Sequence, residues 1–277
     1  MKSKFSKIIT VIAVITIAPV FFFGCSKNSG GKIVIKGSTT VLPITQKAAE
    51  EYRKTNKISI SIEGSGSGNG IKAIIDGTCD IGNSSREMKE KELKSARENG
   101  VKVKEITVAY DMIIPVVHPS NPVKTLTTDQ LKAIYDGSIK NWKEVGGKDA
   151  TIVVISRDTS SGTYEVWESK IMNKTDVRKD ALLQASNGAV ASSIAGNPKA
   201  IGYIGYGYLS DGMNSVMVNN VEGTIENGKS GKFPISRKLY MYINEAKISK
   251  EAMDFVNYLI GADGQKLVKE AGFIPLM

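Results

Sequence analysis

The sequence is poor in the side chains on which most enzyme and metal chemistry depends. Its 277 residues include two cysteines, Cys25 and Cys79, and a single histidine, His118. Disulfide frameworks, Cys/His metal sites and nucleophiles with an imidazole base all need more of these residues than the chain offers. We therefore predict no enzyme activity, no metal and no cofactor, and we interpret Cys79 as a small buried residue rather than a reactive thiol.

Features of nucleic-acid-binding proteins and of repeat proteins are also missing. The chain has no basic helix, no interleaving of aromatic and basic residues, and no repeat with a period of about 20–50 residues. The longest apolar run, Ile8 to Phe23, has 16 residues, fewer than the roughly 20 that a membrane-spanning helix needs. We therefore expect no nucleic-acid partner, and the apolar run has the length typical of a signal peptide.

The N-terminal segment has the organisation of a lipoprotein signal. The basic residues before the apolar run are Lys2, Lys4 and Lys7. The run ends in FFGC at Cys25, which resembles the lipobox of bacterial lipoproteins, although Phe22 stands where leucine is usual. This resemblance implies a signal peptide over 1–24, a lipid (palmitate) anchor on Cys25, a tether over 25–31 and a location on the extracytoplasmic face of the cell membrane. The alternative is an uncleaved N-terminal anchor, which also leaves the remainder facing outward.

The expected mature chain is mildly basic. Removal of residues 1–24 leaves 34 basic and 28 acidic residues, a net charge of +6. This charge suits an anionic ligand or anionic lipid headgroups.

Apolar strand patterns alternate with helical patterns along the rest of the chain. Strand-like runs are KIVIK, ISISI, TCDIG and TIVVIS, and each precedes a helical pattern. This alternation predicts an α/β fold with a parallel or mixed sheet covered by helices. Two β-rich segments, near 105–117 and 235–243, bracket the middle of the chain. If both cross between lobes, 32–111 plus 236–277 form lobe I and 112–235 form lobe II.

Four short segments rich in glycine, serine and threonine lie between a predicted strand and the helix that follows it. They are GSTTVLP from Gly37, EGSGSGNG from Glu63, IGNSSREM from Ile81 and RDTSSGTYE from Arg157. Helix starts present free N–H groups and the positive end of the helix dipole, so this pattern favours a small anion held by hydrogen bonds. Helix capping without a ligand is the alternative interpretation.

Another segment matches a nucleotide-binding pattern without its context. Residues 223–230, GTIENGKS, satisfy the phosphate-loop expression, but Gly231 and Pro234 follow at once where a helix should continue. We interpret this segment as a hairpin-type loop that binds no nucleotide.

In their order and spacing, the four segments resemble those of the phosphate-binding proteins of bacterial ABC importers, the PstS family. Residues 187–209, NGAVASSIAGNPKAIGYIGYGYL, resemble a later segment of the same family. The resemblance implies a two-lobed type II periplasmic-binding-protein fold with two hinge crossovers. It also implies capture of inorganic phosphate between the lobes and delivery to an ABC permease with a cytoplasmic ATPase; we expect a monomer.

The same resemblance assigns phosphate-binding residues, most of them hydrogen-bond donors near helix starts. They are Thr39, Thr40, Ser67, Gly68, Ser85, Arg157, Ser161, Gly162 and Thr163, with Ser38, Ser84 and Arg86 as further candidates. Arg157 can form a forked contact with two ligand oxygens.

The third segment departs from the family pattern. Ser85 stands where well-known members carry an aspartate that accepts a hydrogen bond from protonated phosphate and repels fully ionised sulfate. A hydroxyl can also accept that hydrogen bond, but it offers no repulsion against sulfate. Arg86 could add charge to the site, or lie in solvent if Ser84–Glu87 forms a capping box.

These observations leave three alternatives to phosphate capture. The same fold could serve sulfate, molybdate or another tetrahedral oxyanion. The chain could also be an exported hydrolase of phosphoesters, or a sensory or adhesive lipoprotein that keeps the anion site for regulation.

Overall fold

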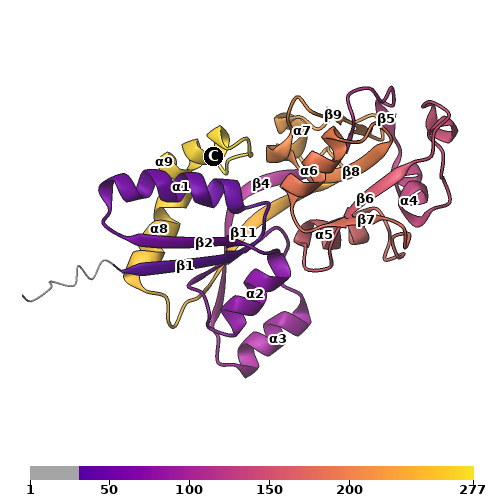
Figure 1. Ribbon diagram of the computed structural model, residues 1–277. Coiled ribbons are helices and arrows are strands. Elements are labelled where there is room, and N and C mark those ends of the chain that lie inside the picture. The colour runs from indigo at the N-terminus through magenta and orange to yellow at the C-terminus, as the bar shows by residue number, and fades with distance from the viewer. Residues whose placement is uncertain (1–30) are drawn as a thin grey trace, which may run out of the picture.

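The structure, a computed structural model, describes residues 31–277. Figure 1 shows two α/β lobes joined by the strands β4 (Val103–Val117) and β11 (Ser236–Asn244). The predicted signal peptide and the proposed lipidation site at Cys25 lie outside the described residues. Within residues 31–277, no helix has the length and apolar character needed to span a membrane.

Lobe I combines the first and the last parts of the described chain. Its elements are β1 (Lys32–Gly37), α1 (Leu42–Thr55), β2 (Ser59–Gly64), α2 (Ser67–Ile75), β3 (Ile81–Ser84), α3 (Glu90–Glu98), α8 (Lys250–Ile260) and α9 (Ala262–Glu270).

Lobe II is built from the middle of the chain. Its strands are β5 (Thr125–Leu126), β6 (Val153–Arg157), β7 (Leu182–Gln184), β8 (Ala200–Gly205), β9 (Asn214–Ser215) and β10 (Met217–Val218). Its helices are α4 (Thr128–Asp136), α5 (Gly162–Lys170), α6 (Asn187–Ala195) and α7 (Ile225–Lys229), with 3₁₀ turns η1 (Trp142–Val145) and η2 (Tyr206–Tyr208).

A mixed sheet runs through both lobes in the order β2-β1-β3-β11-β4-β8-β6-β7. The pairs β1–β2, β1–β3, β6–β8 and β6–β7 are parallel, whereas β4 and β11 are antiparallel to their neighbours. The first part of β4 pairs with β11 and its last residues pair with β8, so one continuous strand enters both lobes. This arrangement confirms the predicted α/β fold with a mixed sheet.

The hydrophobic core divides near the point in β4 where its partner changes from β11 to β8. One cluster of buried residues draws on 33–109 and 239–273, and a second on 112–235 together with Ile274. A third, smaller cluster around α2 and α3 draws on 71–101 with Tyr240 and Tyr242, and also belongs to lobe I. We therefore propose the lobe boundaries that the sequence suggested, 32–111 plus 236–277 and 112–235, because, apart from Ile274, the buried residues of the first two clusters divide at Asp111 and Ser236.

Several helix boundaries follow from local chemistry. The Thr127 hydroxyl accepts a hydrogen bond from Gln130 N–H over 3.0 Å and caps α4, as its position predicts. Pro43 occupies the first turn of α1, where its missing N–H has no helical partner to lose. Gly100, with φ of +68°, follows α3 in the left-handed conformation that suits glycine.

Two local predictions were wrong. Ser84–Glu87 forms no capping box, because α3 begins later and the Glu92 carboxylate accepts from Lys89 N–H over 2.8 Å. The Glu87 carboxylate instead accepts from the Tyr240 hydroxyl over 3.1 Å. Residues 223–230 are not a simple hairpin loop, since they contain α7, but they do not form the strand–loop–helix that a phosphate loop requires.

Candidate functional site

The four predicted segments meet where the two lobes face each other. Lobe I contributes the turn before α1, the start of α2 and the residues after β3, and lobe II contributes the end of β6 and the start of α5. Hydrogen bonds join the lobes here: Gly68 N–H donates to the Ser160 carbonyl over 3.0 Å, and the hydroxyl oxygens of Thr40 and Thr163 lie 3.1 Å apart. The starts of α2 and α5 therefore converge on one region.

The predicted side-chain donors are buried in this region. Apart from Ser84, those with an exposed fraction of 3% or less are Ser38, Thr39, Thr40, Ser67, Ser85, Arg157, Ser161 and Thr163. Gly162 allows their close approach, because a Cβ atom there would lie 2.8 Å from both Ser67 Cβ and Ser85 Oγ. The structure thus gathers donors from both lobes into a cage of hydroxyl and N–H groups, which we call the donor cage.

Arg157 supplies the cage with a buried positive charge. Its Nε donates to the Gln184 carbonyl over 2.9 Å and one terminal nitrogen, Nη2, donates to the Ala185 carbonyl over 3.0 Å. The other terminal nitrogen, Nη1, has no hydrogen-bond partner among residues 31–277. Burial lowers the pKa of the guanidinium, although the neighbouring Asp158 opposes this shift. A buried cation with a free donor provides a contact for an anion.

Ser84 and Arg86, two of the further candidates, do not join the cage. The Ser84 hydroxyl donates to the Arg86 carbonyl over 2.7 Å. The Arg86 guanidinium forms ion pairs with Glu92 at 2.7 Å and, across the lobes, with Glu165 of α5 at 2.8 Å. Arg86 therefore contributes to contact between the lobes, and its charge is neutralised by carboxylates.

The sequence analysis missed three polar residues beside the cage. Asn187, at the start of α6, donates to the Thr39 hydroxyl over 3.1 Å and to the Thr40 hydroxyl over 3.0 Å. Arg237 of β11 donates to the Thr163 hydroxyl over 3.0 Å. Asp111 of β4 holds Arg237 through contacts of 2.9 Å and 2.7 Å. One of the three, Asp111, could have been noticed in the sequence, because it is the one charged residue in the otherwise uncharged run 106–117.

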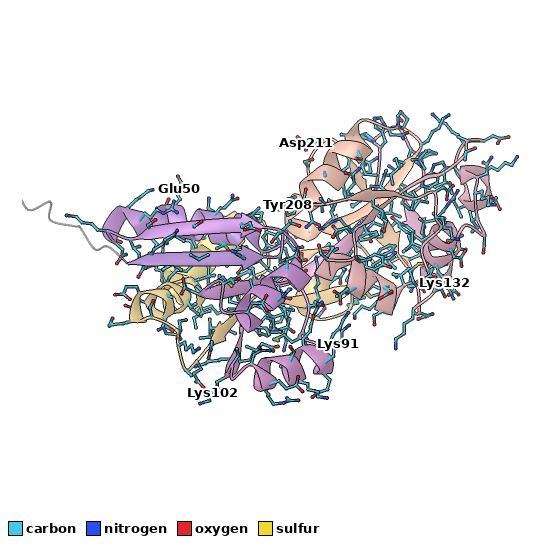
Figure 2. The ribbon with its side chains drawn as sticks, turned by 60° about the horizontal axis from the view of Figure 1, so that its bottom comes forward. Glu50, Lys91, Lys102, Lys132, Tyr208 and Asp211 are labelled. Carbon is cyan, nitrogen blue, oxygen red and sulfur yellow. The ribbon has the colours of Figure 1, made fainter. Side chains whose placement is uncertain are left out.

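The Asp111–Arg237 pair connects the donor cage to the two strands that cross between the lobes. Burial raises the pKa of Asp111 and lowers that of Arg237, while their mutual attraction opposes both shifts. Tyr208, which Figure 2 shows at the junction of the lobes, donates from its hydroxyl to the Thr39 carbonyl. The cage is therefore bounded by side chains from both lobes and from the crossing strands.

A larger cavity lies outside the cage. Its volume is about 610 Å³, and it is lined by Arg86, Glu165 and Arg237 together with lysines such as Lys170 and Lys229. It does not include the cage hydroxyls or Arg157, so its size does not make it the candidate site. The chemistry of the donors makes the buried cage the candidate site.

Residues 31–277 also contain no cluster of His, Cys, Asp and Glu that could hold a metal ion. Cys79 is partly buried, and burial raises the pKa of its thiol to about 12. This supports the prediction that Cys79 is not a reactive thiol, because the thiolate is the nucleophilic form.

Comparisons with known proteins agree with this geometry. Residues 26–263 match the model of the PBP superfamily domain. A phosphate-binding protein PstS from Borreliella burgdorferi is 32% identical over 279 residues, covering 96% of this chain and 98% of that protein. A substrate-binding protein from Clostridium perfringens, assigned to phosphate ABC transport, has a crystal structure that contains bound phosphate. Its sequence is 34% identical and its structure matches with a TM-score of 0.84, covering 89% of this chain and all of that one. An ABC-type phosphate transport receptor from Vibrio cholerae is 31% identical with a TM-score of 0.73, covering 87% and 99%.

Proposed function

The chain belongs to the PstS family of the PBP superfamily, and from this premise we propose that it captures inorganic phosphate between its lobes and delivers it to an ABC-type permease. The observation that carries the proposal is the buried Arg157, whose Nη1 lacks a partner within residues 31–277 and which belongs to the same short segment as the buried Ser161 and Thr163 of the cage. The nine predicted residues of the site are proposed as phosphate ligands on the same ground.

The proposed mechanism is capture by closure. The donor cage combines hydroxyls, N–H groups at two helix starts and one guanidinium, all held in place by the fold. Contact between the lobes excludes water, so that hydrogen bonds to an enclosed dianion meet no competition from solvent. A wrong ligand leaves buried donors or acceptors unpaired, which weakens its binding. The site binds and releases phosphate and does not need a nucleophile or base.

The proposal extends to the part of the chain outside the described residues. We propose that the signal peptide is removed, that Cys25 carries a lipid and that the binding lobes lie at the extracytoplasmic face of the membrane as a monomer. The closed lobes would then dock on the permease subunits, whose ATPase is cytoplasmic. The family resemblance of the N-terminal segment and of the whole chain supports this arrangement.

Isothermal titration calorimetry on residues 26–277 tests the proposed function. We expect saturable phosphate binding with a Kd in the micromolar range or tighter. Sulfate and molybdate should be titrated in parallel, because Ser85 offers no repulsion against a fully ionised oxyanion. Absence of phosphate binding would refute the proposal, and tighter binding of sulfate or molybdate would favour the alternative oxyanion. Phosphoester hydrolysis by the purified protein would instead indicate an enzyme.

The ion pair between Arg86 and Glu165, which joins the lobes, should slow the release of phosphate. Glu165 lies 2.8 Å from Arg86 and also contacts Lys89, and its side chain is only 11% exposed. Glu165→Gln should speed phosphate dissociation roughly tenfold, because the closed state loses an attraction between partly buried charges. Stopped-flow measurement of phosphate release checks this prediction.

Glu168→Gln is the matched control for this variant. Glu168 lies on the same helix and forms no ion pair among the described residues. Its substitution should leave the release rate unchanged. Equal release rates for Glu165→Gln and the wild type would show that the ion pair does not stabilise closure.

A further inference from the structure

The orientation of the Asn187 amide determines whether the hydroxyls of Thr39 and Thr40 accept or donate hydrogen bonds. Its side-chain oxygen accepts from Gly205 N–H over 3.1 Å, which places the NH₂ group toward Thr39 and Thr40. Asn187 is fully buried, and an NH₂ group can only donate. Both threonine hydroxyls therefore accept from Asn187, and their own hydrogens must be directed elsewhere.

Arg237 acts in the same way on Thr163 and Thr40. One terminal nitrogen donates to Thr163 Oγ1 over 3.0 Å and the other approaches Thr40 Oγ1 at 3.4 Å. Its pairing with Asp111 holds the guanidinium in this position, and arginine has no acceptor to offer. Thr40 thus accepts from two nitrogen donors, so both of its lone pairs are used and its hydroxyl must donate. Thr163 Oγ1 lies 3.1 Å away and can accept this hydrogen; since it also accepts from Arg237, the Thr163 hydroxyl must itself donate.

The remaining cage hydroxyls follow the same pattern, with one exception. Ser38 accepts from Thr40 N–H and Val41 N–H. The other serines that accept from a backbone N–H are Ser67, from Ser85 over 2.9 Å, and Ser161, from Tyr164 over 3.2 Å. Ser85 Oγ alone among these described cage hydroxyls receives no nitrogen donor, and its contact is the Ser67 hydroxyl at 3.2 Å.

We propose that Asn187 and the Arg237–Asp111 pair are specificity-determining residues that make the cage threonines donors, leaving Ser85 as the acceptor for a single ligand proton. Resting on the proposed function, this inference predicts which anion the site takes. Singly protonated phosphate and unprotonated sulfate both fit. Doubly protonated phosphate fits less well, because its second O–H group would have to share a hydroxyl oxygen that already accepts from an N–H group, in a site closed to water.

Calorimetry with two anions tests this inference on the wild-type protein. Phosphate affinity should fall roughly tenfold below the second ionisation of phosphate, because an unpaired buried donor weakens binding by about that factor. Sulfate carries no proton over the same pH range, so its affinity should stay constant and exclude a general effect of pH on the protein. Phosphate affinity that is equal above and below that ionisation would overturn the inference and leave the proposed function intact. Failure of the wild type to bind either anion would overturn both.

The Asn187→Leu variant tests the named residue, because leucine has a similar size and cannot donate. Thr39 and Thr40 then become free to accept, so the ratio of phosphate affinities above and below the ionisation should shrink toward one. Sulfate should bind less tightly. Ser186→Ala is the control: it removes the cap of α6, in which Ser186 Oγ accepts from Ala189 N–H over 3.0 Å, without touching the threonines.

Ser186→Ala should lower thermal stability and keep the wild-type affinity ratio. An unchanged ratio in Asn187→Leu would refute the role of Asn187. Should that variant fail to fold, the wild-type pH profile still decides the inference.

Discussion

Replacement of Arg157 by methionine is expected to weaken phosphate binding roughly 10- to 100-fold. A buried hydrogen bond to a charged group contributes about 1.5–3 kcal/mol, and the Nη1 group of Arg157 has no competing partner among residues 31–277. Methionine keeps an unbranched side chain of similar length. The fold should therefore survive, because the lost hydrogen bonds to Gln184 and Ala185 are offset by removal of a buried charge. Calorimetry gives the affinity and thermal unfolding gives the stability.

Arg178→Met is the matched control for this prediction. Arg178 belongs to the same lobe, and its guanidinium pairs with the exposed carboxylate of Asp180 over 2.6 Å. Its replacement should leave phosphate affinity unchanged. If Arg157→Met binds phosphate as tightly as the wild type, Arg157 is not a ligand and the cage must hold the anion by neutral donors alone.

A methyl group at Gly162 is expected to prevent closure. An ideal Cβ there would lie 2.8 Å from Ser67 Cβ and from Ser85 Oγ, both on the opposite lobe. These atoms belong to short side chains on backbone segments that cannot yield without moving the lobe. Overpacking of this kind costs about 1–3 kcal/mol, so Gly162→Ala should weaken phosphate binding roughly 10- to 100-fold. The unliganded, open protein should keep its stability.

Small-angle X-ray scattering with and without phosphate distinguishes a failure of the lobes to close from a local disturbance of the binding site. The wild type should become more compact on binding, and Gly162→Ala should show a smaller change at saturating phosphate. Gly188→Ala is the control, since Gly188 also lies in the first turn of a lobe II helix and a Cβ there would have Ser186 Oγ, at 3.9 Å, as its nearest neighbour. Normal compaction in Gly162→Ala would show that the closed state tolerates a side chain at this position.

The fold and the helix starts of the cage were predictable because their signals are local. Alternating strand and helix patterns indicated the mixed α/β sheet, and the serine and threonine segments marked the places where strands lead into helices. The capping error at Ser84 has a physical cause. Two overlapping signals competed, and the Lys89–Glu92 box prevailed because the Glu87 carboxylate pairs with Tyr240, which is distant in the sequence.

The chain by itself determined which groups could hold an anion, since hydroxyls and glycines at helix starts are set by neighbours within a few residues. Only the tertiary structure decided how those groups are oriented. Arg237 lies 197 residues from Thr40, and Asn187 lies 148 residues from Thr39. Such contacts have no short-range periodicity or motif, because they form only when the two lobes and the crossing strands meet. The direction in which each hydroxyl donates is therefore a property of the assembled fold.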